Sequence, residues 1–131
     1  MDSLKPHAGI RHVALFVRDL EACTRFYCDV LGYRVEWHPD ADNIYLCSGS
    51  DNLALHRASE ESTTTGGRLD HIGILLREAA QVDLWHQHCA AHNVRIVAPP
   101  KTHRDGARSF YCTDPDGTVV QFIHHLPIAG S

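Results

Sequence analysis

Three polar side chains stand inside segments that otherwise have the apolar pattern of strands. His12 lies in IRHVALFV, His71 in LDHIGILL and Gln121 in TVVQFI. A polar group buried without a partner costs free energy, so each of these side chains needs a hydrogen-bonding or ligand partner. The chain has eleven histidines, which is its compositional oddity. These three polar residues are therefore candidate functional residues of the chain.

A hairpin is predicted around Gln121. Residues 109–112 have strand character, DPDG at 114–117 has turn chemistry, and 118–123 are rich in β-branched and aromatic residues. Pro115 sets φ for a turn, and Gly117 tolerates a positive φ. The hairpin places Gln121 in mid-strand, and the alternation of strand side chains puts Ser109 and Tyr111 on one face.

The elements that must position these groups occur twice along the chain. The first half predicts a strand at 10–17, a helix from Asp19 to Gly32, and strands at 33–37, 43–47 and 53–57. The second half predicts a strand at 69–76, a helix at 78–93, a strand at 94–97 broken by Pro99-Pro100, and the hairpin. HVALFVRDLEA matches HIGILLREAAQ, which sets His12 against His71.

This repetition predicts an α+β fold. Two βαβββ modules should form a curved, cupped mixed sheet with helices on the outer face, because one copy cannot cover its own sheet. Module one spans 9–58 and module two spans 69–126, joined by a polar, glycine-containing linker at 59–68 within a single domain of residues 1–131.

Composition excludes several classes of function. The formal charge of −4 has no basic run, so we expect no nucleic-acid partner. No apolar run has membrane-spanning length, and MDSLKPHAG lacks a signal-peptide core, so we expect a cytoplasmic protein without a membrane partner. The five cysteines are odd in number and lie mostly in apolar segments, so we expect reduced, buried thiols.

The motifs HVALFVRDLEACTRFYCDVLGYRV, LDHIGILL and SFYCTDPDGTVVQF together resemble those of the vicinal oxygen chelate superfamily. That superfamily contains glyoxalase I, extradiol dioxygenases, fosfomycin-resistance transferases and bleomycin-resistance binding proteins. The resemblance covers roughly residues 10–126 and includes both the order of elements and the terminal hairpin. It implies the fold more specifically than the reaction, because one fold hosts many functions. It also implies a homodimer, in which the linker at 59–68 could permit exchange of modules.

The resemblance implies a divalent metal (Fe, Mn, Zn, Ni or Co) held by His12, His71 and Gln121. The family usually has Glu where this chain has Gln121. The three ligands would therefore be formally neutral and would bind a divalent ion more weakly. Ala54 stands where a fourth ligand can occur, and His56, two residues further on the same face, is a candidate substitute. The alternative is a degenerate site whose polar groups bond to one another.

The resemblance to fosfomycin-resistance enzymes also implies substrate contacts. Lys101, Ser109 and Tyr111 match the positions that meet an anionic substrate, and the segment KTHRDGAR adds His103 and Arg108. We expect Tyr111 and His103 to be catalytic, and Lys101, Arg108, Ser109 and His56 to bind substrate. The alternative for Tyr111 is an amphipathic core residue.

Two functions follow from these expectations. The first is a glyoxalase-like metal-dependent enzyme of lyase, isomerase, transferase or dioxygenase type that chelates the vicinal oxygens of a small substrate. Within this class Ala54 disfavours glyoxalase I chemistry, and Gln121 disfavours extradiol cleavage. The second is a bleomycin-resistance-like binding protein without catalysis, whose groove would have Trp37, Tyr45 and Phe110 as candidate lining residues. The alternative is that all three are ordinary core residues.

Overall fold

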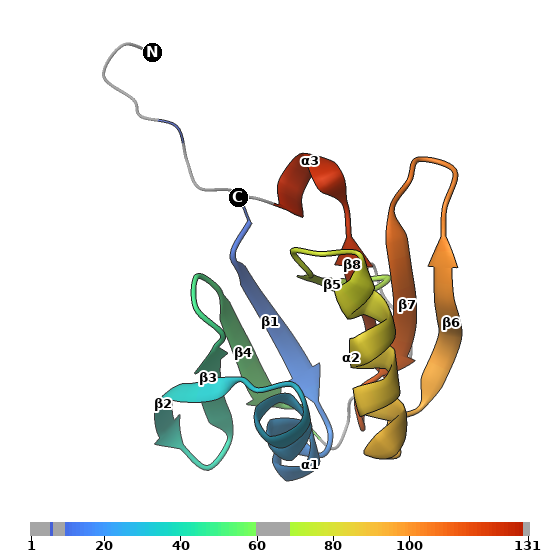
Figure 1. Cartoon of the computed structure of the whole chain (residues 1–131). Coiled ribbons are helices and arrows are strands. Elements are labelled where there is room, and N and C mark those ends of the chain that lie inside the picture. The colour runs from blue at the N-terminus through green and yellow to red at the C-terminus, as the bar shows by residue number, and fades with distance from the viewer. Residues whose placement is uncertain (1–5, 7–9, 60–68, 130–131) are drawn as a thin grey trace. The chain divides into compact units, whose positions relative to one another are not determined.

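The structure is a computed structural model that describes residues 6, 10–59 and 69–129. The chain divides into two compact units, residues 1–60 and 61–131. Each unit contains one four-stranded mixed sheet and one main helical segment (Figure 1). The prediction of two βαβββ modules in an α+β fold is confirmed. Beyond Ser59, the predicted linker lies outside the described residues.

Unit 1 is built from β1 (His12–Val17), α1 (Leu20–Arg25), the π-helical turn η1 (Phe26–Val30), β2 (Arg34–Asp40), β3 (Asn43–Cys47) and β4 (Asn52–Arg57). Its strand order is β1-β4-β3-β2, with β1 and β4 parallel and the other pairs antiparallel. Asp19 caps the helix, because its carboxylate accepts from the Ala22 amide over 2.9 Å. Gly32, with φ of 84°, ends the helical segment as predicted.

Unit 2 repeats this plan with β5 (Ile72–Leu75), α2 (Ala80–Ala91), β6 (Ile96–Thr102), β7 (Arg108–Thr113) and β8 (Val119–His124), followed by the short α3 (Leu126–Ala129). Its strand order is β5-β8-β7-β6, and α2 lies across one face of the sheet (Figure 1). Trp85 of α2 stacks on Phe122, which stacks on Phe110. This aromatic stack is the core between helix and sheet.

The predicted β7–β8 hairpin forms around the DPDG turn. One oxygen of Asp114 accepts from the amides of Asp116 and Thr118, each over 2.9 Å, and Gly117 has φ of 94°. The local turn chemistry in the sequence therefore determined this hairpin.

One strand boundary was predicted wrongly. We expected Pro99 and Pro100 to end the strand that begins near residue 94, whereas β6 runs through both prolines to Thr102. The physical reason is that β6 is an edge strand, paired with β7 alone and with irregular register, so a missing amide can face away from the ladder.

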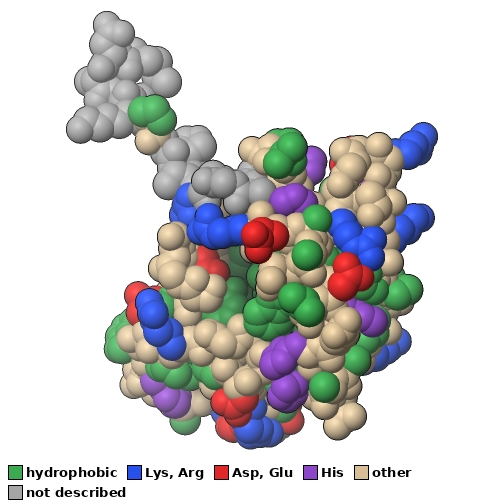
Figure 2. Space-filling view, viewed as in Figure 1, with side chains coloured by type: hydrophobic (Ala, Val, Ile, Leu, Met, Phe, Trp, Pro, Cys, Tyr) green, Lys and Arg blue, Asp and Glu red, His purple; other side chains and the backbone are tan. Residues whose placement is uncertain are grey.

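The five cysteines form no disulfide, and Cys23, Cys89 and Cys112 are buried as expected, whereas Cys28 and Cys47 are half-buried. No helix among the described residues is long and apolar enough to cross a membrane. On the face shown in Figure 2, acidic and basic side chains are interspersed and do not gather into one basic patch.

Candidate functional site

The register of the second sheet places Gln121 beside Tyr111. On β8, Gln121 lies between Tyr111 of β7 and Gly73 of β5. In unit 1, Ala54 of β4 holds the same position, beside Tyr45 of β3. The duplication predicted from the sequence therefore extends to the pairing of individual residues, and the second copy places a polar side chain where the first has a methyl group.

Gln121 is 9% exposed, and its partner is the phenol of Tyr111. The amide nitrogen of Gln121 donates to the Tyr111 hydroxyl oxygen over 3.0 Å. The ring of Tyr111 meets the His71 imidazole edge to face, with centroids 5.6 Å apart and planes at 89°. Unit 2 thus brings three predicted site residues together. Because the amide nitrogen is engaged, the carbonyl oxygen of Gln121 is the atom available to a ligand.

His71 is held by its neighbour and lies diagonally across from Gln121. Its Nδ1 is 2.6 Å from a carboxylate oxygen of Asp70, which can only accept, so Nδ1 carries the proton. Gly73 pairs with Gln121, and His71 is two residues before Gly73 on the same side of the chain. The Cα atoms of His71 and Gln121 are therefore roughly 8 Å apart, near enough for both side chains to reach one ion.

A groove of about 690 Å³ opens over Gln121 and Tyr111. Its remaining lining residues come from the end of β6, the β6–β7 connection and β8: Lys101, Thr102, His103, Arg104, Asp105, Ala107 and Ile123. His103 Nε2 lies 3.0 Å from the Ser109 hydroxyl, and Ser109 is itself only 1% exposed. Ser109 therefore sits behind His103 and contacts it. The groove presents cationic side chains beside a phenol and an amide.

Arg108 does not line this groove. Its guanidinium makes two hydrogen bonds of 2.8 and 2.9 Å to Asp83 of α2 and a third to Thr102. The bond from Arg108 holds the pKa of Asp83 below its ordinary value. These hydrogen bonds hold α2 against β7. Arg108 was expected from the sequence to contact substrate, and we do not include it among the substrate contacts that we propose. Strand alternation was the signal that we missed, because it puts Arg108 and Tyr111 on opposite faces.

In unit 1, the partner of His12 is Asn52, which the sequence did not single out. His12 Nδ1 lies 2.7 Å from the Asn52 carbonyl oxygen, and the Asn52 amide nitrogen donates to Glu36. Since a carbonyl oxygen only accepts, Nδ1 of His12 is the donor and Nε2 carries the lone pair. Asn52 is paired with His12 across β1 and β4, two residues before Ala54.

His56 lies too far along the strand to take the place of Ala54 beside His12. It is level with Phe16, whereas His12 is level with Asn52, four residues away and thus roughly 13 Å along β4. Its ring packs against those of Phe16 and Tyr45, and its Nδ1 lies 2.6 Å from Asn43 Oδ1.

Two of the three aromatic residues expected to line a groove are at the surface, and the third is not. Trp37 is 60% exposed and stacks on Tyr45, with centroids 5.2 Å apart. Phe110 is fully buried in the aromatic core of unit 2, so it is a core residue, as the alternative expected, and does not line a groove. It alternates with Tyr111 on β7 and therefore faces α2.

The predicted metal ligands are two imidazoles and one carboxamide. Among the described residues, no three His, Cys, Asp or Glu side chains are grouped so that they could hold a metal ion. The set His12, His71 and Gln121 nevertheless has the donor chemistry that a divalent ion requires. Each imidazole donates through Nδ1 to a side-chain oxygen and keeps Nε2 as a lone-pair donor, as metal-binding histidines do. Gln121 adds a carbonyl oxygen.

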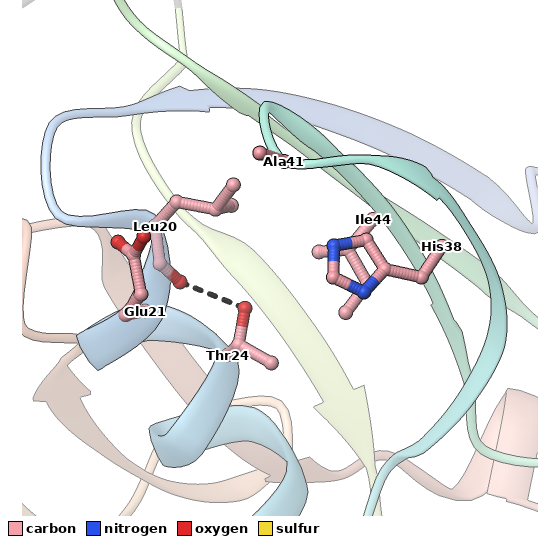
Figure 3. A pocket seen from close by; sticks show the side chains of 6 residues that line it. All are labelled: Leu20, Glu21, Thr24, His38, Ala41 and Ile44. Atoms are coloured by element: carbon pink, nitrogen blue, oxygen red, sulfur yellow. Dashed lines mark hydrogen bonds between the residues drawn. The ribbon is translucent and has the colours of Figure 1, made fainter.

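A second pocket, of about 360 Å³, lies in unit 1 between α1 and the β2–β3 hairpin (Figure 3). Glu21 at its rim pairs with Arg57, which lowers the pKa of Glu21 to about 2, and the Thr24 hydroxyl donates to the Leu20 carbonyl. His38 and Ile44 face it from the hairpin. Because Glu21 and Thr24 are already bonded within the protein and no predicted site residue lines this pocket, we do not assign it a reaction.

Comparison with known proteins finds relatives of the same fold. The chain is 27% identical, over 97% of its length, to a catechol-2,3-dioxygenase of Bacillus subtilis (strain 168), and it spans 45% of that relative. A glyoxalase/bleomycin resistance protein/dioxygenase from Alicyclobacillus acidocaldarius superposes with a TM-score of 0.73 at 20% identity, covering 91% of this chain and 92% of that one. A lactoylglutathione lyase from Agrobacterium tumefaciens also gives 0.73 at 22% identity, covering 92% and 96%.

At these identities the two solved structures show likeness of fold, and they do not assign a reaction. The family assignment comes from the sequence itself, because a family model matches residues 9–122, which is most of the chain. The protein therefore belongs to the Glyoxalase/Bleomycin resistance protein/Dioxygenase superfamily.

Proposed function

We propose that this protein is a glyoxalase-like, metal-dependent enzyme that acts on a small substrate with vicinal oxygens. His12, His71 and Gln121 would hold a divalent ion, with both modules forming one domain in a homodimer. When bound, such an ion supplies Lewis-acid stabilisation of negative charge that develops on a substrate oxygen. The observation that carries the proposal is the group formed by His71, Tyr111 and Gln121 at the edge of a cationic groove.

The chain's own residues have separate roles in this proposal. Tyr111 orients the Gln121 amide through a 3.0 Å hydrogen bond, and its phenol faces the groove where it can donate a proton to substrate. His103, backed by the buried Ser109 hydroxyl, is the second proton-transfer group. Lys101 lines the same groove and would bind an anionic part of the substrate.

The ligand set narrows the reaction class. Extradiol cleavage uses two histidines and a carboxylate, and Gln121 leaves this set without its negative charge. Glyoxalase I chemistry needs a ligand where Ala54 has only a methyl group, and His56 lies four residues from the level of His12. The chemistry that remains is isomerisation, epimerisation or the opening of a strained ring, in which the ion stabilises an enolate or alkoxide.

Metal analysis of untagged, untreated protein tests the proposal. We expect about one divalent ion per chain, and His71→Ala should lose it. Gln121→Glu should bind the ion at least about tenfold more tightly, because it adds a full negative charge to a neutral set. His124→Gln is the matched control, since His124 lies on the same strand but its ring contacts the Leu76 carbonyl. Metal affinity unchanged in Gln121→Glu would remove Gln121 from the ligand set.

A second function, ligand binding without catalysis, is favoured by the stacked pair Trp37 and Tyr45. An exposed indole held parallel to a phenol at 5.2 Å is a surface on which a flat ligand can stack. Protein that carries no metal, yet shows a ligand-induced rise in melting temperature, would favour this function over the enzyme.

A further inference from the structure

Two exposed histidines lie one turn apart near the end of α2. The i, i+4 spacing of His88 and His92 places both side chains on one side of the helix. Their ring centroids are 4.4 Å apart, with the planes at 49°. Neither residue lines the groove over Gln121. The pair is therefore a second cluster of imidazoles, separate from the candidate site described above.

The imidazole of His92 is fixed in one tautomer. Its Nδ1 lies 2.9 Å from the backbone carbonyl oxygen of His88. A carbonyl oxygen can only accept, so Nδ1 is the donor and Nε2 carries the lone pair. Histidines that ligate a metal are usually held in this way, because a hydrogen bond from the second nitrogen to a carbonyl or carboxylate fixes the orientation of the ring.

The spacing of the two rings suits one shared ion. An imidazole nitrogen binds a metal at about 2.0 Å, so two rings on one ion have centroids roughly 4.5 Å apart at a right angle and roughly 5.2 Å apart at the tetrahedral angle. The observed 4.4 Å is close to the first value. Right angles between ligands are typical of the square-planar and tetragonal geometries that Cu²⁺ and Ni²⁺ adopt.

The surroundings of the pair also favour a cation and leave it accessible. The pair stands in the last turn of a twelve-residue helix, where the helix dipole has its negative end. His88 borders a surface hollow of about 330 Å³, and the ring of Trp85 meets its imidazole edge to face at 5.3 Å. An ion bound here would therefore lie close to an indole.

We propose that His88 and His92 form a second metal site, which takes one late divalent transition ion such as Ni²⁺ or Cu²⁺. Within the part of the chain that the structure describes, no third His, Cys, Asp or Glu joins the pair, so water would occupy the remaining positions. With two protein ligands the site holds its ion more weakly than a three-ligand centre does, and it fills when the ion is added. It does not depend on the reaction proposed above.

The test is a titration of the full chain with Ni²⁺, after chelator treatment and dialysis, followed by tryptophan fluorescence. Ni²⁺ is the probe because Cu²⁺ oxidises thiols and the chain has five cysteines. The chain has two tryptophans, so Trp37→Phe leaves Trp85 as the reporter beside His88. We expect Ni²⁺ to quench this fluorescence, with a one-to-one stoichiometry at the quenched site.

Three substitutions test the pair itself. His88→Ala and His92→Ala should each weaken Ni²⁺ binding at least about tenfold, because the second imidazole binds intramolecularly. Both positions are exposed and alanine favours helix, so the variants should fold. His86→Gln is the matched control on the same helix, since the ring of His86 packs on Phe110, and it should leave the affinity unchanged.

A double variant separates spacing from histidine content. Gln87→His combined with His88→Gln keeps the number of histidines but sets the pair five residues apart, so it should also lose at least about tenfold in affinity. Affinity retained in this variant or in His92→Ala would overturn the proposal. Quenching lost in His71→Ala but kept in His88→Ala would place the ion at the other centre and overturn it too. The reverse result supports the second site, whether or not the first holds a metal.

Discussion

Replacing Tyr111 by Phe removes one oxygen atom and tests the central contact of the site. The phenol accepts the only hydrogen bond assigned to the Gln121 side chain among the described residues. The ring that meets His71 edge to face is retained in Phe. The substitution therefore separates the hydrogen bond from the packing around it.

The expected loss follows from the burial of Gln121. A neutral hydrogen bond contributes about 1 kcal/mol, and a buried donor left without a partner costs up to about 3. Gln121 is 9% exposed and lines the groove, so water can reach the amide and the cost should stay near about 1 kcal/mol. For a chain of this length that is a fall of about 4 °C in melting temperature.

Tyr45→Phe is the matched control that the duplicated fold provides. Tyr45 occupies the position in unit 1 that Tyr111 occupies in unit 2, but its neighbour across the strand is Ala54, which offers no polar atom. We expect this control to change stability by less than about 0.5 kcal/mol.

A double-mutant cycle, measured by urea unfolding, gives the coupling energy between Tyr111 and Gln121. Tyr111→Phe, Gln121→Met and the double variant should give a coupling energy of about 1 kcal/mol. A coupling energy below about 0.3 kcal/mol, or equal losses in Tyr111→Phe and Tyr45→Phe, would refute the reasoning. Gln121 would then have to find its partner elsewhere.

Two further perturbations test the scaffold. Asp114→Ala removes a buried carboxylate that accepts from two backbone amides, so it should lower the free energy of unfolding in urea by about 2 kcal/mol. The control Asp105→Ala loses one hydrogen bond at an exposed site and should lower it by less than about 1 kcal/mol. Glu21→Gln removes the pairing with Arg57 that lowers the pKa of Glu21 to about 2. Because the pKa of Glu21 is lower in the folded state than in the unfolded state, its ionised form stabilises the fold at pH values above the unfolded pKa. This contribution is lost as the pH falls through the folded pKa. The stability difference between wild type and Glu21→Gln should therefore shrink between pH 4.5 and about 2, and a difference independent of pH would contradict the pairing.

Much of the fold could be predicted from local sequence because local chemistry determines it. Asp19 caps a helix and Gly32 ends it through properties of single residues, and the turn at 114–117 needs only its own four side chains. The prolines of β6 were misjudged because their effect depends on what lies beside the strand. An edge strand tolerates a missing amide, and edge position is a property of the whole sheet.

The candidate site was predicted less completely for the same reason. Alternation along one strand tells which side chains share a face, and it correctly grouped Ser109 with Tyr111. It does not tell which residue of the next strand lies opposite. The pairing of His12 with Asn52, and of Tyr111 with Gln121, became visible only in the register of the sheets.

By itself, then, the sequence determined the two βαβββ copies, their caps and turns, and the polar residues at mid-strand, because each depends on neighbours within a few positions along the chain. Tertiary structure decided the partners: Asn52 for His12, Tyr111 for Gln121 and Asp83 for Arg108. Those contacts join residues from 10 to 40 positions apart. Strand register and helix packing bring them together. The β1–β4 register and the packing of α2 are properties of the assembled fold, whereas the β7–β8 register also depends on the local turn at 114–117.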